Sequence, residues 1–236
     1  MQQPLIPMIV TRPAAAGEAF VRRLPEPLRQ KLEIIESPLL SIVPVTPGAG
    51  SDRCEGAVFT SSNGVRYAPD ARGRKAWCVG GATTETARQA GWDAVEAGAD
   101  SAALTETLIS LRPALRLAHF SGVHTRGRVA DRLSDAGFTI ERIAVYDQPL
   151  LPLTQAARAA VSGERQVIVP LFSPRTAAWF TKECPAPQNV IAVFLSAAVA
   201  RATGQAPFAQ QVISAWPDAQ SVVTCIENLT VNARPG

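Results

Sequence analysis

Small hydroxyl residues and glycines recur at one kind of position in this chain, directly after a short apolar run and directly before a helical pattern. Such a run is typical of a buried parallel strand, so these residues are expected at strand carboxyl ends. Free backbone N–H groups at a helix start bind anions, and the helix dipole adds to the attraction. Several such ends would suit a ligand with many carboxylates or phosphates, although helix capping is the alternative role of each hydroxyl alone. The positions are Thr11-Arg12, Ser61-Ser62-Asn63, Gly80-Gly81-Ala82-Thr83, Ser173-Pro174-Arg175 and Leu195-Ser196.

Tyr146 is a candidate for acid–base chemistry, because general acids and bases are otherwise scarce at the expected strand ends. It is one of two tyrosines and ends an apolar strand pattern. Its phenol is a weak acid that can donate a hydrogen bond to a departing hydroxyl. The alternative role is an aromatic that packs between domains.

Motifs for the common cofactors are missing. The sequence contains no GxGxxG fingerprint, no P-loop pattern and no GxSxG elbow, which disfavours dinucleotide, nucleotide and hydrolase chemistry. No acidic pair stands at paired strand ends, as a glycosidase requires. The four cysteines lie far apart, no CxxC occurs, and with His119 and His124 their spacing fits no common zinc pattern. We therefore expect no metal and no cofactor, and we expect Cys78 and Cys225 to be buried.

Short apolar runs alternate with helical patterns along the chain, which is typical of an α/β protein with parallel sheets and helices on both faces. The runs predict strands at 9–11, 57–60, 77–80, 115–120, 139–146, 166–172 and 190–195. The helical patterns predict helices at 14–31, 83–90, 126–136, 175–180 and 197–202.

An internal repeat indicates two similar α/β domains. Residues 79–91 align without gaps on residues 192–204, which places Thr83 on Ser196, and residues 59–63 align on 171–175. The alternative is that any two strand–helix units look alike. Proline-rich stretches at 37–47 and 147–152 predict connections, because proline disfavours helices and central strands.

The composition excludes several classes of protein. With 47% hydrophobic and 18% charged residues among 236, the chain is not a disordered one. A net charge of +3 is too mild to indicate a nucleic-acid partner. No apolar run approaches the length of about 18–20 residues that crosses a bilayer, and the first eight residues lack the features of a secretory signal. We expect a cytoplasmic protein with no nucleic-acid or membrane partner.

Taken together and in order, these motifs resemble the uroporphyrinogen-III synthase family over nearly the whole chain. Each motif alone is a generic turn between a strand and a helix, and the ordered set is what carries the resemblance. The set comprises Val10-Thr11-Arg12-Pro13, residues 59–65, residues 79–83, Gly122, Asp135-Ala136-Gly137-Phe138, Val145-Tyr146, residues 172–177 and residues 195–204.

The resemblance implies a fold and a division of the chain. The fold is two flavodoxin-like α/β domains, each a parallel sheet with helices on both faces, joined by two extended segments. A first, discontinuous domain would comprise residues 1–37 and 152–236, and a second, inserted domain residues 42–147. Residues 38–41 and 148–151 would form the connections.

The resemblance also implies an activity. Members of the family cyclise the linear tetrapyrrole hydroxymethylbilane to uroporphyrinogen III, with inversion of ring D and loss of water, and use no metal or organic cofactor. The chain would then be a hydro-lyase of porphyrin biosynthesis. We expect a monomer whose partner is this carboxylate-rich substrate, with a possible transient contact to the preceding pathway enzyme.

The site residues follow from the same resemblance. Tyr146 matches the family tyrosine proposed to assist departure of the hydroxyl. Two arginines, Arg126 and Arg128, are further candidate carboxylate partners. The residues expected to bind substrate are Arg12, Ser61, Ser62, Asn63, Gly81, Thr83, Gly122, Ser173, Pro174, Arg175 and Ser196.

The sequence departs from the family pattern at the start of the last repeat unit and after the strand near residue 120. Many members have Gly-Pro-x-Thr where this chain has Val193-Phe194-Leu195-Ser196, and many have Arg-Gly where it has Ser121-Gly122.

Two other functions stay open: a non-catalytic tetrapyrrole- or polyanion-binding module on the same fold, and an unrelated two-domain binder of a small polar ligand. Tyr146 together with both hydroxyl sets favours the synthase.

Overall fold

The computed structural model describes residues 4–48, 50–125 and 128–232. The chain forms two compact units, of which unit 1 takes in Met1–Ser41 and Pro149–Gly236 and unit 2 takes in Ile42–Gln148. No helix among the described residues is both long enough and apolar enough to span a membrane.

Unit 1 contains a parallel five-stranded sheet. Its strands are β1 (Ile6–Val10), β2 (Leu32–Glu36), β9 (Val167–Leu171), β10 (Val190–Phe194) and β11 (Gln210–Ile213), in the spatial order β11-β10-β9-β1-β2. Numbered along the chain, this is the order 2-1-3-4-5 of flavodoxin.

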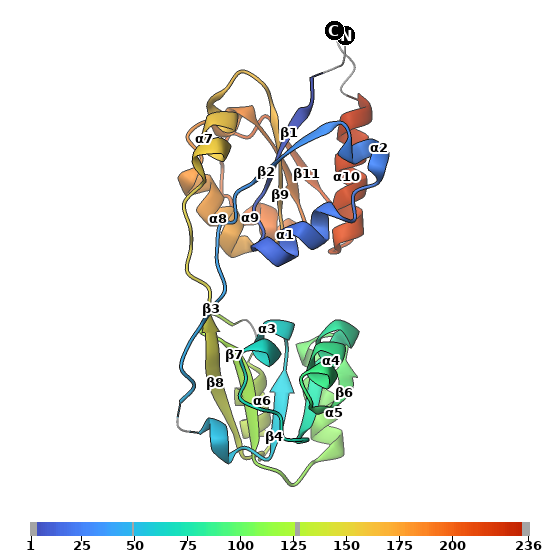
Figure 1. Cartoon of the computed structure of the whole chain (residues 1–236), viewed down its shortest axis with the longest axis vertical. Helices are drawn as coiled ribbons and strands as arrows, with labels where there is room; N and C mark the ends of the chain where they lie inside the picture. Colours follow the sequence, from blue (N-terminus) through green and yellow to red (C-terminus); the bar gives the residue numbers. More distant parts are fainter. Residues whose placement is uncertain (1–3, 49, 126–127, 233–236) are drawn as a thin grey trace. The chain divides into compact units, whose positions relative to one another are not determined.

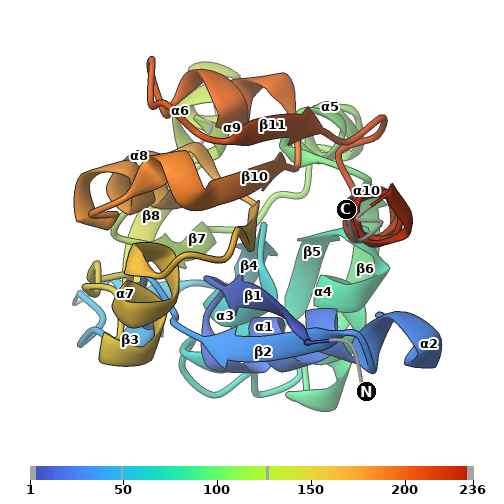
Figure 2. The same ribbon diagram turned by 90° about the horizontal axis from the view of Figure 1, so that it is seen from above.

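Helices cover both faces of this sheet, with α7 and α8 on one side and α2 and α10 on the other (Figure 2). Alternating strand residues divide between the two cores: Val169 packs with α7, α8 and α9, and Ile168 packs with α1, α2 and α10. The helices are α1 (Ala14–Val21), α2 (Glu26–Arg29), α7 (Gln155–Ser162), α8 (Pro174–Glu183), α9 (Ala197–Arg201) and α10 (Ala219–Asn232).

Unit 2 contains a six-stranded sheet in the order β3-β8-β7-β4-β5-β6. Five strands are parallel and follow the order 3-2-1-4-5 along the chain, which is the other common doubly wound order. The edge strand β3 pairs antiparallel with β8. The strands are β3 (Val43–Pro44), β4 (Gly56–Phe59), β5 (Lys75–Val79), β6 (Asp93–Gly98), β7 (Leu117–Gly122) and β8 (Ile140–Asp147).

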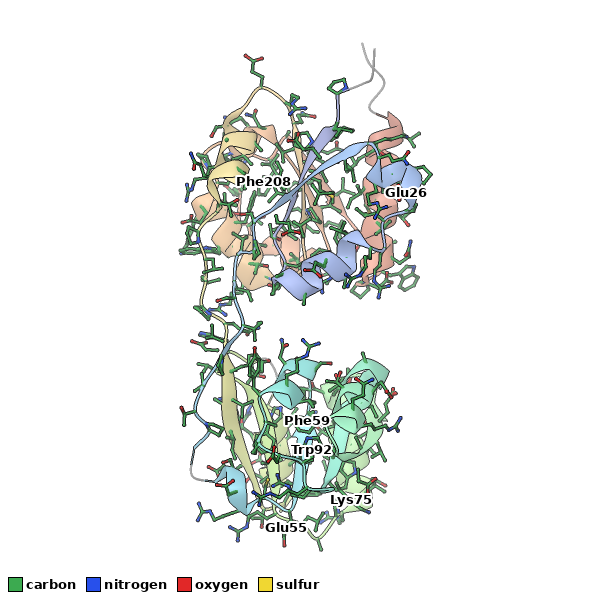
Figure 3. All side chains as sticks on the ribbon, viewed as in Figure 1. Glu26, Glu55, Phe59, Lys75, Trp92 and Phe208 are labelled. Atoms are coloured by element: carbon green, nitrogen blue, oxygen red, sulfur yellow. The ribbon has the colours of Figure 1, made fainter. Side chains whose placement is uncertain are left out.

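The helices of unit 2 also form two layers. Phe59 and Trp92, both labelled in Figure 3, meet edge to face with ring centroids 5.1 Å apart in the core under α3 and α4. Val58, on the opposite face of β4, packs with α5 and α6. The helices are α3 (Ser62–Arg66), α4 (Gly80–Gln89), α5 (Ser101–Leu111) and α6 (Val129–Asp135).

Each sheet has one point at which the chain reverses its direction of strand addition. In unit 1 it lies between β1 and β9, because α1 and α8, which follow these strands, cover opposite faces. In unit 2 it lies between β4 and β7, whose following helices α3 and α6 also cover opposite faces. Ligands of open α/β sheets bind at the carboxyl ends of the strands at such a point.

The predicted α/β class with helices on both faces is confirmed, and several boundaries differ. The helix predicted at 14–31 is two helices, because Pro25 precedes α2 and proline cannot continue a helix interior. The helix predicted to begin at 83 begins at Gly80. Four strands lie outside the prediction, and they are the edge strands of the two sheets: β2, β3, β6 and β11. Their outward residues are polar or exposed, so they form no continuous apolar run, and β3 lies within the stretch 37–47 that was predicted as a connection.

Gly64 tests the packing that places α3 against β7. A Cβ on Gly64 would lie 2.5 Å from the carbonyl oxygen of Phe120, a backbone atom. Helix propensity alone favours alanine at this helical position. We expect Gly64→Ala to destabilise the protein by about 1–3 kcal/mol instead, because overpacking forces backbone shifts. The measurement is urea unfolding followed by tryptophan fluorescence.

Gly48→Ala is the matched control, because no heavy atom lies within 4 Å of a Cβ built there. Its effect should stay within about 0.5 kcal/mol. A Gly64→Ala protein as stable as the control would contradict the close approach of α3 and β7.

Candidate functional site

Ser173 and Ser61 occupy the same structural position in the two units. Ser173 precedes α8, and its Oγ accepts a hydrogen bond from the N–H of Thr176 at 3.2 Å. Ser61 precedes α3, and its Oγ accepts from the N–H of Asn63 at 3.2 Å. Both side chains therefore act as helix N-caps, and they leave other N–H groups of the first turn free for a ligand.

The residues that follow these caps differ in chemistry. Pro174 is the first residue of α8 and has no N–H, whereas Ser62 is the first residue of α3. The Ser62 Oγ accepts a hydrogen bond from Thr86 Oγ1 at 3.2 Å, which ties α3 to α4. Unit 2 therefore retains an N–H at the first position of this helix that unit 1 lacks.

Arg12 lies near the direction-reversal point of unit 1, in the loop that follows β1. Its guanidinium carbon lies 4.5 Å above the ring of Phe172, and Phe172 in turn packs edge to face on Phe20. Burial lowers the pKa of Arg12, and the charge of Arg23 lowers it further. A desolvated cation of this kind favours an anionic partner.

Arg175, in the first turn of α8, carries an orphaned donor. Its Nη1 is buried and has no hydrogen-bond partner among the described residues. A buried guanidinium N–H without an acceptor costs free energy, so an anion at this helix start would relieve the cost. Thr11, beside Arg12, is already engaged, because its hydroxyl donates to the carbonyl of Pro170 at 3.2 Å.

Ser196 differs from the two capping serines. It precedes α9, but its side chain makes no capping hydrogen bond, and it is half-buried. The neighbouring segment after β11 is anchored, because the Ser214 hydroxyl lies 2.8 Å from the carbonyl oxygens of both Leu195 and Trp216. This anchored segment presents Trp216 with 70% of its surface exposed. Nothing in the apolar patterning singled out Trp216 beforehand.

The glycine-rich start of α4 corrects the aligned repeat. The helix begins at Gly80, directly after β5, whereas Leu195 and Ser196 separate β10 from α9. Thr83 is therefore not equivalent to Ser196. It lies inside the first turn of α4 with only 7% of its surface exposed. Gly81, by contrast, is exposed at the second position of the helix, where its N–H has no intrahelical acceptor.

Tyr146 lies on β8 and is 7% exposed, within the core under α3 and α4. Its ring covers Gly122: a Cβ on Gly122 would lie 2.8 Å from Tyr146 Cε2. Burial raises the pKa of Tyr146, while hydrogen bonds with the Ser61 side chain and the Gly122 backbone lower it to a smaller extent. The phenol is thus a protonated weak acid beside the N-cap of α3.

Sequence patterns gave no role to Thr60, which follows β4, to His119 on β7 or to Arg142 on the neighbouring strand β8. Thr60 Oγ1 and His119 Nε2 are 3.3 Å apart. Arg142 hydrogen-bonds to the Ser121 side chain and to the carbonyl oxygens of Gly122 and Val123, at 2.7–3.1 Å. Burial lowers the pKa of His119 to about 4, and the Arg142 charge contributes.

The two further candidate arginines contribute less. Arg128 is exposed and pairs with Asp131 at 3.0 Å, and Arg126 lies outside the described residues.

Cys78 is fully buried as predicted, whereas the prediction for Cys225 was wrong, because this residue is only partly buried on α10. Within residues 4–48, 50–125 and 128–232, no group of three or more His, Cys, Asp or Glu side chains could hold a metal ion.

Comparisons with known proteins agree on one family. The family model for uroporphyrinogen-III synthase HemD matches residues 24–224. The solved uroporphyrinogen-III synthetase of Helicobacter pylori is similar at a TM-score of 0.69 and 13% identity, over 95% of this chain and 99% of that chain. A mutant uroporphyrinogen III synthase from Thermus thermophilus is similar at a TM-score of 0.53 and 14% identity, over 96% of this chain and 99% of that chain. Identities this low show a shared fold. No curated protein sequence gives a significant match.

His119 predicts a pH dependence of stability. Its pKa falls from 6.5 to about 4 on folding, so the unfolded state binds a proton more tightly. The contribution of the neutral His119 ring to the free energy of unfolding is complete above pH 6.5. It is lost as the pH falls toward 4, which lowers the free energy of unfolding by about 3 kcal/mol. We expect the stability difference between the wild type and His119→Gln to shrink by this amount between pH 7 and 4, as measured by urea unfolding.

Gly48→Ala is the control, because it alters no titratable group and a Cβ built there meets no heavy atom within 4 Å. Its stability difference from the wild type should stay constant over the same pH range. A pH-independent difference for His119→Gln would contradict a buried, neutral imidazole.

Proposed function

The chain belongs to the uroporphyrinogen-III synthase family, and from that premise we propose that it cyclises hydroxymethylbilane to uroporphyrinogen III, with inversion of ring D and loss of water. It is an enzyme of tetrapyrrole synthesis, and the proposed step makes it a hydro-lyase. The observation that carries the proposal is the position of Tyr146, a protonated weak acid whose hydroxyl meets the N-cap residue of α3.

Each unit offers its own donors for carboxylates at the carboxyl ends of its strands. The start of α8 with Ser173 and Arg175, and the starts of α3 and α4 in unit 2, offer N–H groups and hydroxyls. Arg12 adds a desolvated cation. The acetate and propionate groups of a tetrapyrrole are the anions that these donors fit. In this proposal Ser62, Asn63, Gly81, Thr83, Gly122, Pro174 and Ser196 shape the same surfaces.

Tyr146 would assist the first chemical step. Loss of the terminal hydroxyl as water requires a proton. The phenol, which is protonated near neutral pH, would share its proton with the departing hydroxyl through a hydrogen bond, while its raised pKa disfavours complete transfer. The azafulvenium cation that forms is stabilised by its own pyrrole nitrogen. Attack through the substituted carbon of ring D gives a spiro intermediate, which fragments and closes with the ring inverted.

The protein's main contribution would then be to hold one folded conformation of the substrate. Direct closure without the enzyme gives the other isomer, so orientation decides the product. No further reactive group is needed, which agrees with strand ends made of hydroxyls, glycines and arginines. We propose that the protein acts as a monomer in the cytoplasm, with a transient contact to the enzyme that supplies hydroxymethylbilane.

An isomer assay tests the proposal. Freshly prepared hydroxymethylbilane is incubated with the purified protein, and the products are oxidised and separated as type I and type III uroporphyrins. We expect type III to exceed the type I product of spontaneous closure. Type I alone, at the rate seen in buffer, would overturn the proposal, and tight product binding without turnover would identify a non-catalytic module.

Tyr146→Phe should lower kcat by about 100-fold, in the range of a lost proton donor. Ser173→Ala is the control from the carboxylate-binding set, and it should lower kcat/KM by less than about tenfold, because one hydrogen bond is worth about 1 kcal/mol. The readout is the initial rate of type III formation. Equal losses in both variants would contradict the assigned role of the phenol.

Gly122→Ala tests the same role through geometry. The added Cβ would meet the Tyr146 ring at 2.8–2.9 Å and displace it, although the phenol itself remains present. We expect kcat to fall toward the Tyr146→Phe value. Wild-type kcat in a folded Gly122→Ala protein would show that the position of the ring is unimportant.

A further inference from the structure

Thr60 and His119 lie at the point of unit 2 where the loops after β4 and β7 leave the sheet toward opposite faces. Thr60 directly follows β4 and is half-buried, whereas His119, on β7, has only 2% of its surface exposed. His119 pairs in register with Val58, which lies in the core under α5 and α6, so Thr60 and His119 share that face. Their side chains meet at 3.3 Å between Oγ1 and Nε2.

The surroundings of His119 determine where its proton lies. Burial lowers the pKa of the imidazole to about 4, so the ring is neutral and carries one N–H near neutral pH. The Nδ1 atom is buried and has no hydrogen-bond partner among the described residues. A proton on Nδ1 would therefore be a buried donor without an acceptor, whereas a proton on Nε2 has Thr60 Oγ1 as its acceptor.

This tautomer assigns the hydrogen bonds of Thr60. The threonine oxygen accepts from His119 Nε2, so its own O–H cannot donate back to the ring and is left for another acceptor. Thr60 directly follows β4 and precedes Ser61, the N-cap of α3. Figure 1 shows β4 leading into α3. The free O–H is thus a donor at the position where ligands of such sheets bind.

We propose that His119 is a positioning residue that fixes the Thr60 hydroxyl as a hydrogen-bond donor to a carboxylate of the substrate. The identity of that carboxylate as an acetate or propionate of a tetrapyrrole rests on the proposed function. Neither Thr60 nor His119 belongs to the set of binding residues expected from the sequence.

Arg142 supports a carboxylate rather than a cationic or neutral group. It pairs in register with His119, and its guanidinium hydrogen-bonds to Ser121 Oγ and to the carbonyl oxygens of Gly122 and Val123. Its positive charge also acts on His119. A carboxylate that accepts from Thr60 would gain from this charge, and an O–H···O⁻ bond is stronger than a neutral one.

The tautomer is measured directly on the ligand-free protein. Nitrogen-15 NMR of protein labelled at histidine distinguishes a protonated Nε2 from a protonated Nδ1, and a His124→Gln sample assigns the signals. We expect the buried ring to carry its proton on Nε2 at pH 7. A proton on Nδ1 would overturn the inference, because Thr60 would then donate to the ring and have no hydrogen left for a ligand.

Kinetics tests the carboxylate contact. Thr60→Val removes the hydroxyl at nearly constant shape, and Thr60→Ser retains it. We expect Thr60→Val to raise KM for hydroxymethylbilane about tenfold, as for the loss of a hydrogen bond to a charged group, and Thr60→Ser to restore most of the loss. His119→Leu, which frees the hydroxyl to rotate, should raise KM in the threonine protein but not in the Thr60→Val background.

The two proposals fail in different ways. If the wild type forms no type III product, the proposed function is overturned, whatever the NMR result. If the wild type is active and Thr60→Val has the same KM, the inference about Thr60 and His119 alone is overturned. Thermal unfolding of each variant separates loss of binding from loss of fold. If His119→Leu still raises KM in the Thr60→Val background, His119 has a merely structural role and the inference is overturned.

Discussion

The first turn of every α-helix leaves backbone N–H groups without partners inside the helix, and this constraint underlies the candidate site. In a parallel α/β sheet these groups collect at the carboxyl ends of the strands, because each strand leads into the helix that follows it. Ser61 and Ser173 each satisfy one such N–H. The groups that remain are donors held in place by the fold, and they attract carboxylates without any movement of the backbone.

Packing turns this general property into specific positions. Gly64 lets α3 approach the backbone of β7, and Gly122 lets the Tyr146 ring lie against the end of the same strand. A side chain at either position would move a helix start or the phenol. Burial then adjusts the chemistry. It raises the pKa of Tyr146, lowers the pKa of His119 so that the ring is neutral, and lowers the pKa of Arg12. It also leaves Arg175 Nη1 without a hydrogen-bond partner among the described residues.

The sequence predicts the fold class because the central strands, such as β4 and β9, are buried on both faces and form continuous apolar runs. It fails at the edge strands β6 and β11, whose outward residues face solvent. The repeat alignment places Ser61 and Ser173 correctly but misplaces Thr83, because Gly80 has a positive φ of 70° and begins α4 directly after β5. His119 and Arg142 escape prediction, since their roles depend on neighbours across β7 and β8 that local patterns do not reveal.

An amide titration tests the central claim most directly. Nitrogen-15-labelled protein is titrated with uroporphyrinogen III, and backbone N–H shifts are followed along the chain. The account predicts the largest chemical-shift changes at the starts of α3, α4 and α8, at residues 61–64, 80–83 and 175–177. Binding of uroporphyrinogen III at these positions should weaken as salt is added. Shifts confined to the opposite ends of the strands, or to the exposed groove near Arg112 and Arg116, would contradict it.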